Sequence, residues 1–207
     1  MLRRKKPSLY TSIWLVIIGY AFMYDHLFWR LQLRVAEGSA PLYPGWLCYV
    51  FILLAIPTLA GYQKSVTLLR PLAWYLGAVT LVRWIFQLVG RVLDGWYVYA
   101  VNVVTSVVVL YFHFQLQTNL CKIIKPFNSE RARLIRNFRS VSAVVNTVKC
   151  FPIQLGQSPE MELLQSGIAF FATLGVGGTQ AELFMSLRDI RARSMAAPAS
   201  PQKEGEL

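Results

Sequence analysis

The chain has 207 residues, of which 55% are hydrophobic and only 15% are charged, yet its formal net charge at pH 7 is +11. A soluble nucleic-acid-binding protein with so basic a balance normally has far more charged surface, and a soluble protein of this size is rarely so apolar. Both properties agree with a chain that lies in a membrane and gathers its basic residues on one side. Composition therefore argues against nucleic acid as a partner and predicts an integral membrane protein.

Four apolar stretches approach the length of about 20 residues that a helix needs to cross a bilayer. The predicted spans are 9–29, 45–62, 71–90 and 96–118. Pro71 suits the start of the third helix, and aromatic residues such as Trp29 and Trp96 stand where the membrane interface is expected. The alternative is a set of buried helices in a soluble domain, but four such stretches before residue 122 leave little chain to cover them.

The chain that follows is less apolar. Residues 140–156 and 161–178 predict a weak fifth and sixth span that form a helical hairpin, because 161–178 is apolar on more than one helix face. The alternative is a pair of amphipathic helices that lie on the cytoplasmic membrane surface. The fold class predicted for residues 1–178 is therefore all-α, a polytopic transmembrane bundle of four spans and this weaker hairpin.

Two further segments are expected at the C-terminal side. Thr179-Gln180-Ala181-Glu182 matches a capping box and predicts a short cytoplasmic amphipathic helix at 179–195. Residues 196–207 consist mainly of Pro, Ala, Ser and charged residues, which predicts a disordered tail.

The basic residues predict the orientation. With the N-terminus inside, the cytoplasmic segments hold Arg3, Arg4, Lys5, Lys6, Lys64, Arg70, Lys122, Lys125, Arg131, Arg133, Arg136, Arg139, Arg188, Arg191, Arg193 and Lys203. The other side holds Arg30, Arg34, Arg91 and Lys149. This positive-inside bias predicts a multi-pass protein of the cell membrane with both termini in the cytoplasm, where its basic residues contact anionic lipid headgroups. The N-terminal basic and apolar run also resembles a secretory signal, but it continues without a polar break and is interpreted as a retained anchor.

Polar residues within the spans are the candidate site. Arg83 and Gln87 share one face of the third helix, and Asn102 starts a polar stripe on the fourth. A charge near the middle of a bilayer costs about 2.5 to 3.5 kcal/mol and is expected to face protein or water. The functional interpretation is a polar cavity in which Arg83 binds a solute, with Gln87, Asn102 and Asp25 as partners. The structural alternative is that Arg83 snorkels or pairs with Asp25 while the amides fix helix packing.

No catalytic or metal-binding pattern is present. The chain has two histidines and three cysteines, none in metal-ligand spacing, and no phosphate-binding loop or nucleophile elbow. We therefore expect no enzyme activity, no cofactor and no metal site. Asp25, His26 and His113 support only a third hypothesis of a membrane enzyme.

The first functional hypothesis is a non-enzymatic component of a cytoplasmic membrane that binds or assembles with other membrane components, which include a membrane-protein partner. The alternative is a small-solute permease, or the substrate-binding membrane subunit of an uptake system, with a polar cavity around Arg83. A closed polar cavity that joins Arg83, Gln87 and Asn102 would favour the alternative.

Overall fold

The computed structural model describes residues 8–23, 32–35, 38–41, 44–91, 95–150 and 159–196, and these are helical apart from turns and one short hairpin. The helices are α1 (Leu9–Met23), α3 (Trp46–Tyr62), the 3-10 helix η1 (Lys64–Leu68), α4 (Leu69–Leu88), α5 (Trp96–Ile124), α6 (Ser129–Cys150) and α7 (Pro159–Ala196). The strands β1 (Gln32–Val35) and β2 (Gly38–Pro41) pair antiparallel, with Leu33 opposite Ala40. The predicted helical architecture is confirmed for this part of the chain, and the hairpin is an addition that the sequence did not predict.

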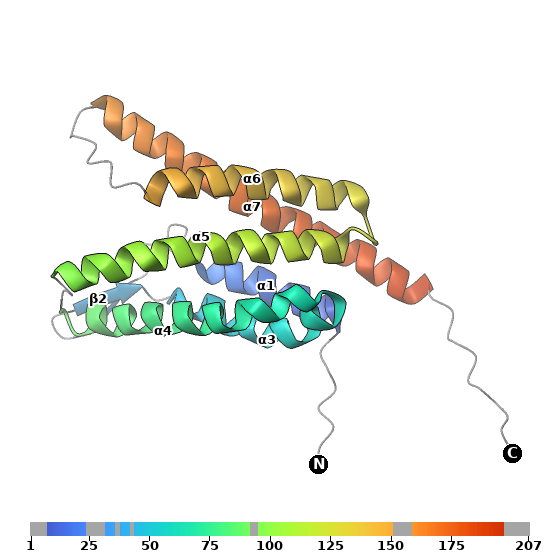
Figure 1. Ribbon diagram of the computed structural model, residues 1–207, viewed down its shortest axis with the longest axis horizontal. Coiled ribbons are helices and arrows are strands. Elements are labelled where there is room, and N and C mark those ends of the chain that lie inside the picture. The colour runs from blue at the N-terminus through green and yellow to red at the C-terminus, as the bar shows by residue number, and fades with distance from the viewer. Residues whose placement is uncertain are drawn as a thin grey trace, which may run out of the picture.

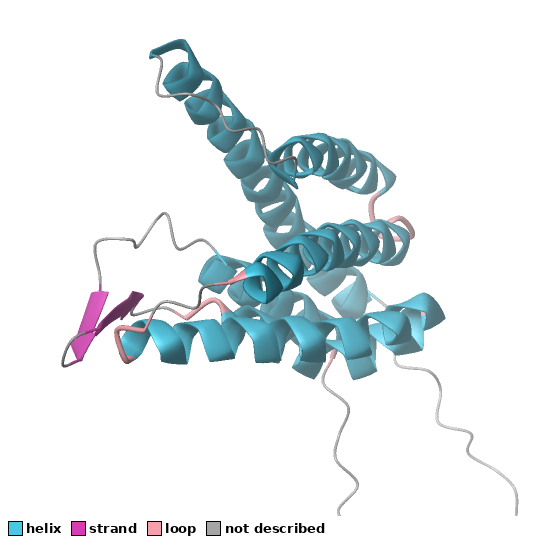
Figure 2. Cartoon of the chain, turned by 60° about the vertical axis from the view of Figure 1, so that its left-hand side comes forward, coloured by secondary structure: helices cyan, strands magenta, loops and turns pink. Residues whose placement is uncertain are grey.

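The α-helices pack in a cycle around a common core. Helix α1 packs on α3, α3 on α4, α4 on α5, α5 on α6 and α6 on α7, and α7 returns to α1 (Figure 1). Buried side chains from each of these helices form one hydrophobic cluster, which includes Ile13, Ile52, Leu76, Phe112 and Leu183. Helix α7 crosses the others at a steep angle, as Figure 2 shows from the side.

The helix ends that the charge pattern assigns to one side also lie together. One cavity is lined by Ser8 before α1, Tyr62 at the end of α3, Phe127 after α5 and Ile190 near the end of α7. The corresponding ends of these helices lie toward the right of Figure 1. Close by, the Ser65 hydroxyl after α3 donates to the Asn119 side chain of α5 at 2.7 Å. The opposite end holds the β1–β2 hairpin, which packs on α4.

The end of α4 follows from its sequence. Gly90 has a φ of 69°, a left-handed conformation that glycine adopts without steric cost. The Gly90 amide donates to the Gln87 carbonyl at 3.1 Å and the Arg91 amide donates to the Phe86 carbonyl at 3.0 Å. This pair of bonds is the Schellman motif, which satisfies the last carbonyls of the helix and ends it.

Two segments are long and apolar enough to cross a membrane. These are the continuous helical segment Lys64–Leu88, with 25 residues, and Trp96–Ile124, with 29 residues. The apolar helices Leu9–Met23 and Trp46–Tyr62 have 15 and 17 described residues and are shorter than that length. The predicted bundle of four spans is therefore not confirmed as a whole, and residues 24–29 of the first predicted span lie outside the described part.

The predicted C-terminal hairpin exists as a pair of packed helices, but its boundaries differ from the prediction. Helix α6 begins at Ser129 and not at residue 140, because the Asn128 side-chain oxygen accepts the Arg131 amide at 3.1 Å and caps the first turn. Among the described helices, neither α6 nor α7 has the length and composition of a membrane span. The basic residues in the first turns of α6 make this helix too polar for a membrane span.

The predicted separate helix at 179–195 is wrong, because α7 runs without a break from Pro159 to Ala196. The Thr179 hydroxyl does not cap a new helix and instead donates to the Gly175 carbonyl one turn earlier, at 2.8 Å. Thr179 is itself buried. The capping-box pattern therefore falls in a helix interior, and the tail at 197–207 lies outside the described residues.

Helix α7 approaches α6 closely at two glycines. A Cβ atom on Gly175 would lie 2.2 Å from the Ser142 hydroxyl oxygen and 3.2 Å from the Ser142 amide nitrogen. A Cβ atom on Gly178 would lie 2.5 Å from the Phe138 ring, whereas one on Gly177 would meet nothing within 4 Å. The absence of these side chains lets the two helices cross at short range.

Within the described part of the chain, α4 and α5 expose many apolar side chains. Trp74 is 63% exposed, Val104 54% and Val107 57%. Further exposed apolar residues on these two helices are Val82, Ile85, Val101, Val103 and Tyr111. Exposed apolar side chains in this number on two helices are typical of a surface that lipid or another protein covers.

Candidate functional site

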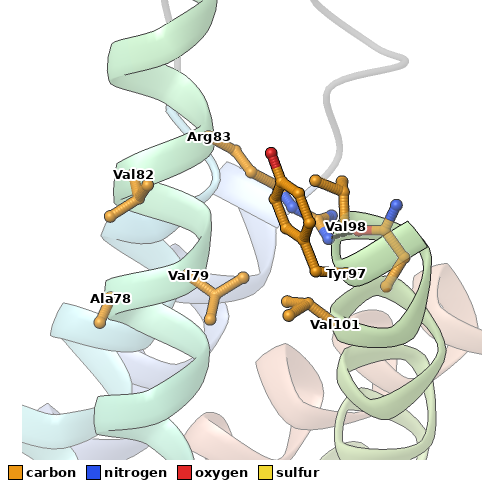
Figure 3. A pocket seen from close by; sticks show the side chains of 8 residues that line it. Ala78, Val79, Val82, Arg83, Tyr97, Val98 and Val101 are labelled. Carbon is orange, nitrogen blue, oxygen red and sulfur yellow. Dashed lines mark hydrogen bonds between the residues drawn. The ribbon is translucent and has the colours of Figure 1, made fainter. Parts of the chain in front are cut away.

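Helices α4 and α5 form an open groove near the end of α4 and the start of α5. Its volume is about 320 Å³, and Figure 3 shows side chains from both helices around it. The groove is lined by Ala78, Val79, Val82 and Arg83 of α4 and by Tyr97, Val98, Val101 and Asn102 of α5. We call this feature the α4–α5 groove. Among the described residues, its lining is apolar except for Arg83, Asn102 and the hydroxyl of Tyr97.

Arg83 crosses the groove and joins the two helices. Its guanidinium group donates to the side-chain oxygen of Asn102. The Asn102 carbonyl also accepts the Ser106 hydroxyl of the next turn at 2.9 Å, so Asn102 is bonded through both its side chain and its backbone. Nearer the core, the hydroxyls of Tyr75 and Thr105 form a second bond between α4 and α5, at 3.1 Å.

The positive charge of Arg83 is not neutralised by a carboxylate within the described part of the chain. Both ion pairs found there are made by Arg131, at the other end of the bundle. Asn102 supplies a dipole and no charge, and the surrounding valines supply neither. Within the described part of the chain, Arg83 therefore lies next to an apolar face without a carboxylate partner.

The structure brings together two of the four predicted site residues. Arg83 and Asn102 meet as expected. Gln87 is exposed and does not line the α4–α5 groove. Asp25 lies outside the described residues.

The sequence interpretation missed Tyr97, whose ring stands in the groove beside Arg83 (Figure 3). The spacing of the sequence could have placed Tyr97 at the site. Tyr97 lies one turn before Val101, next to Val98 and Asn102, and residues three and four apart share a helix face.

Two further polar residues of α4 and α5, Thr80 and His113, do not line the groove. The Thr80 hydroxyl donates to the Leu76 carbonyl of its own helix at 2.7 Å. His113 is buried in the bundle core, where its Nδ1 lies 3.3 Å from the Tyr20 hydroxyl and its ring packs against Tyr49 and Phe112. His113 is therefore a residue of the bundle core.

A small cavity beside His113 is too confined for a substrate. Gln117 of α5 and Arg139 and Ser142 of α6 line it with His113, and its volume of about 10 Å³ corresponds to one water molecule. The Arg139 guanidinium donates to the Thr118 hydroxyl at 2.8 Å and lies 4.5 Å from the centre of the Phe114 ring. These contacts connect α5 to α6, so their role is structural.

A polar network joins α6 and α7 at the end of the bundle that carries most basic residues. Arg131 donates to the Asp189 carboxylate at 2.8 Å and to Glu182 at 3.3 Å. Asn128 also donates to Asp189, at 2.9 Å. Burial raises the pKa of Asp189, but the bonds from Arg131 and Asn128 lower it by more, and the net shift is downward from the ordinary value of 3.8.

The described residues contain no cluster of three or more His, Cys, Asp or Glu side chains that could hold a metal ion. Cys48 and Cys121 are buried free thiols. Comparison of the chain with protein-family models, with curated proteins and with solved structures found no match in any of the three.

Proposed function

We propose that this chain is an integral protein of a cytoplasmic membrane that acts by assembling with another membrane protein, without chemistry of its own. Its multi-pass topology would place both termini in the cytoplasm. The charge distribution supports this topology, since the helix ends that converge at one end of the bundle flank most of the basic residues.

The observation that carries the proposal is the location of Arg83 in an open, apolar groove on the uncovered face of α4 and α5. Lipid tails can cover an apolar surface, but they cannot stabilise a charge that is flanked by valines. We infer that the partner presents a transmembrane helix with an Asp or Glu at the depth of Arg83. Charge pairing selects this partner, and the small side chains of Ala78 and Val79 give its backbone a close approach.

The geometry favours assembly over transport. A permease or the binding subunit of an uptake system would use a polar cavity that closes around its solute. The α4–α5 groove opens to the outside of the bundle, most of its lining is apolar, and Gln87 is not part of it. Purified protein that moves a small solute into liposomes by itself would refute the assembly proposal.

A synthetic helix provides a direct test. The labelled protein is reconstituted in vesicles with a polyleucine transmembrane helix that carries one central Glu, and association is measured by energy transfer. The Glu helix should associate more tightly than the matching Gln helix, by on the order of tenfold. The Arg83→Met variant should lose this difference, and Arg83→Glu should instead prefer a helix that carries a central Lys.

Arg91→Met is the matched control, since Arg91 is exposed two residues beyond the C-cap of α4 and does not line the groove. It should keep the preference for the Glu helix. Equal binding of the Glu and Gln helices by the unmodified protein, or a preference that survives in Arg83→Met, would overturn the proposed docking site.

A further inference from the structure

A second cavity lies at the opposite end of the bundle from the α4–α5 groove, where several helix ends converge. Its volume is about 370 Å³. Its lining consists of Ser8, Leu9 and Tyr10 of the α1 start, Tyr62 of α3, Phe127 of the α5–α6 turn, and Ile190 and Arg193 of α7. We call it the helix-end cavity. The proposed topology places it at the cytoplasmic surface of the membrane.

The two parts of this cavity differ in chemistry. Leu9 and Ile190 are buried and form an apolar floor, with Phe127 beside them. Arg193 and the largely exposed Tyr62 provide polar groups at the rim. A ligand that fits both parts needs an apolar portion and a polar head.

The electrostatics of the rim favour a negative head. Arg193 is held in place because its guanidinium donates to the Pro126 carbonyl and lies 5.8 Å from the centre of the Phe127 ring. The positive end of the α1 dipole points to the same place, and the first turn of α1 contains no acidic residue. The described residues that line the cavity include no carboxylate.

We propose that the helix-end cavity binds one anionic phospholipid, with its phosphate at Arg193 and the start of its acyl chains on Leu9 and Ile190. A free phosphate would use the cation but not the apolar floor, so the floor selects the lipid. Basic pockets between helices at the cytoplasmic side are suited to such headgroups. The inference rests on the membrane location in the proposed function, but it does not depend on the partner helix.

The test titrates the full-length protein in a neutral detergent with short-chain phosphatidylglycerol, short-chain phosphatidylcholine and glycerol 3-phosphate, with calorimetry as the readout. Phosphatidylglycerol should bind at least about fivefold more tightly than phosphatidylcholine. Glycerol 3-phosphate, which lacks the chains, should not compete. Effective competition by it would assign the cavity to a free phosphate and overturn the lipid assignment.

Three variants locate the site. Arg193→Gln should abolish the preference for phosphatidylglycerol, and Tyr62→Glu, at an exposed rim position, should do so by repulsion without loss of the Arg193 contacts. Arg133→Gln removes the same charge from an exposed position of α6 outside the cavity and should keep the preference. Equal losses in Arg193→Gln and Arg133→Gln would indicate diffuse attraction and no discrete site.

The two proposals fail in different ways. Protein that remains in the soluble fraction when expressed without detergent would contradict the proposed function. Membrane-inserted protein without a preference for phosphatidylglycerol would remove only the lipid site.

Discussion

At the residue scale, the arginines at the two ends of the bundle have different partners. Arg131 has two carboxylate partners, Asp189 and Glu182, and connects α6 to α7. Arg83 has only the neutral Asn102 within the described part of the chain. A paired arginine contributes to the fold, whereas an arginine that keeps its charge on an apolar face is suited to bind something outside it.

The Asp189 network predicts a loss of stability in acid. Because folding lowers the pKa of Asp189, its contribution is complete above the unfolded value and is lost as the pH falls through the lower folded value. The thermal midpoint in detergent should therefore fall as the pH drops below about 4. Asp189→Asn should lower the midpoint at pH 7 and flatten this acid dependence.

Glu130→Gln is the control for that experiment, since Glu130 is exposed and makes no ion pair in the described part of the chain. It should retain the acid dependence of the unmodified protein. An Asp189→Asn variant that matches the unmodified protein at every pH would show that the network does not stabilise the α6–α7 contact.

At the element scale, uniform apolar stretches were predictable and helix boundaries set by tertiary contacts were not. The structure places α3 at Trp46–Tyr62 against a predicted 45–62, because this stretch is apolar throughout and ends at Gln63. The start of α6 depends on the cap at Asn128, and the continuity of α7 depends on Thr179 being buried against its neighbours. Neither burial nor a cap in a charged segment is visible in hydrophobic periodicity.

The close α6–α7 crossing predicts that alanine substitution changes stability differently at two nearby glycines. Gly175→Ala should destabilise the protein by about 1 to 3 kcal/mol, because the new Cβ atom meets the backbone of α6. Gly177→Ala has open space and should leave stability unchanged or raise it by up to about 1 kcal/mol through helix propensity. Thermal or denaturant unfolding in detergent measures both, and equal effects of the two substitutions would contradict the close crossing.

At the scale of the whole molecule, the site was predictable only in part. The meeting of Arg83 and Asn102 followed from two polar stripes on neighbouring helices. The openness of the groove and the role of Tyr97 depend on how α4 and α5 are placed side by side, which helical spacing does not specify. Most of the basic residues behind the net charge of +11 flank helix ends that converge at one end of the bundle.

The most direct test of the membrane topology is cysteine labelling with an impermeant maleimide, in a variant whose three native cysteines are replaced. Arg91→Cys lies beyond α4 at the proposed outer surface, and Lys125→Cys lies beyond α5 at the proposed cytoplasmic surface; both positions are exposed. The topology predicts that Arg91→Cys reacts in intact cells, whereas Lys125→Cys reacts only after the membrane is opened. Labelling of Lys125→Cys in intact cells, or equal protection of both positions until lysis, would contradict it.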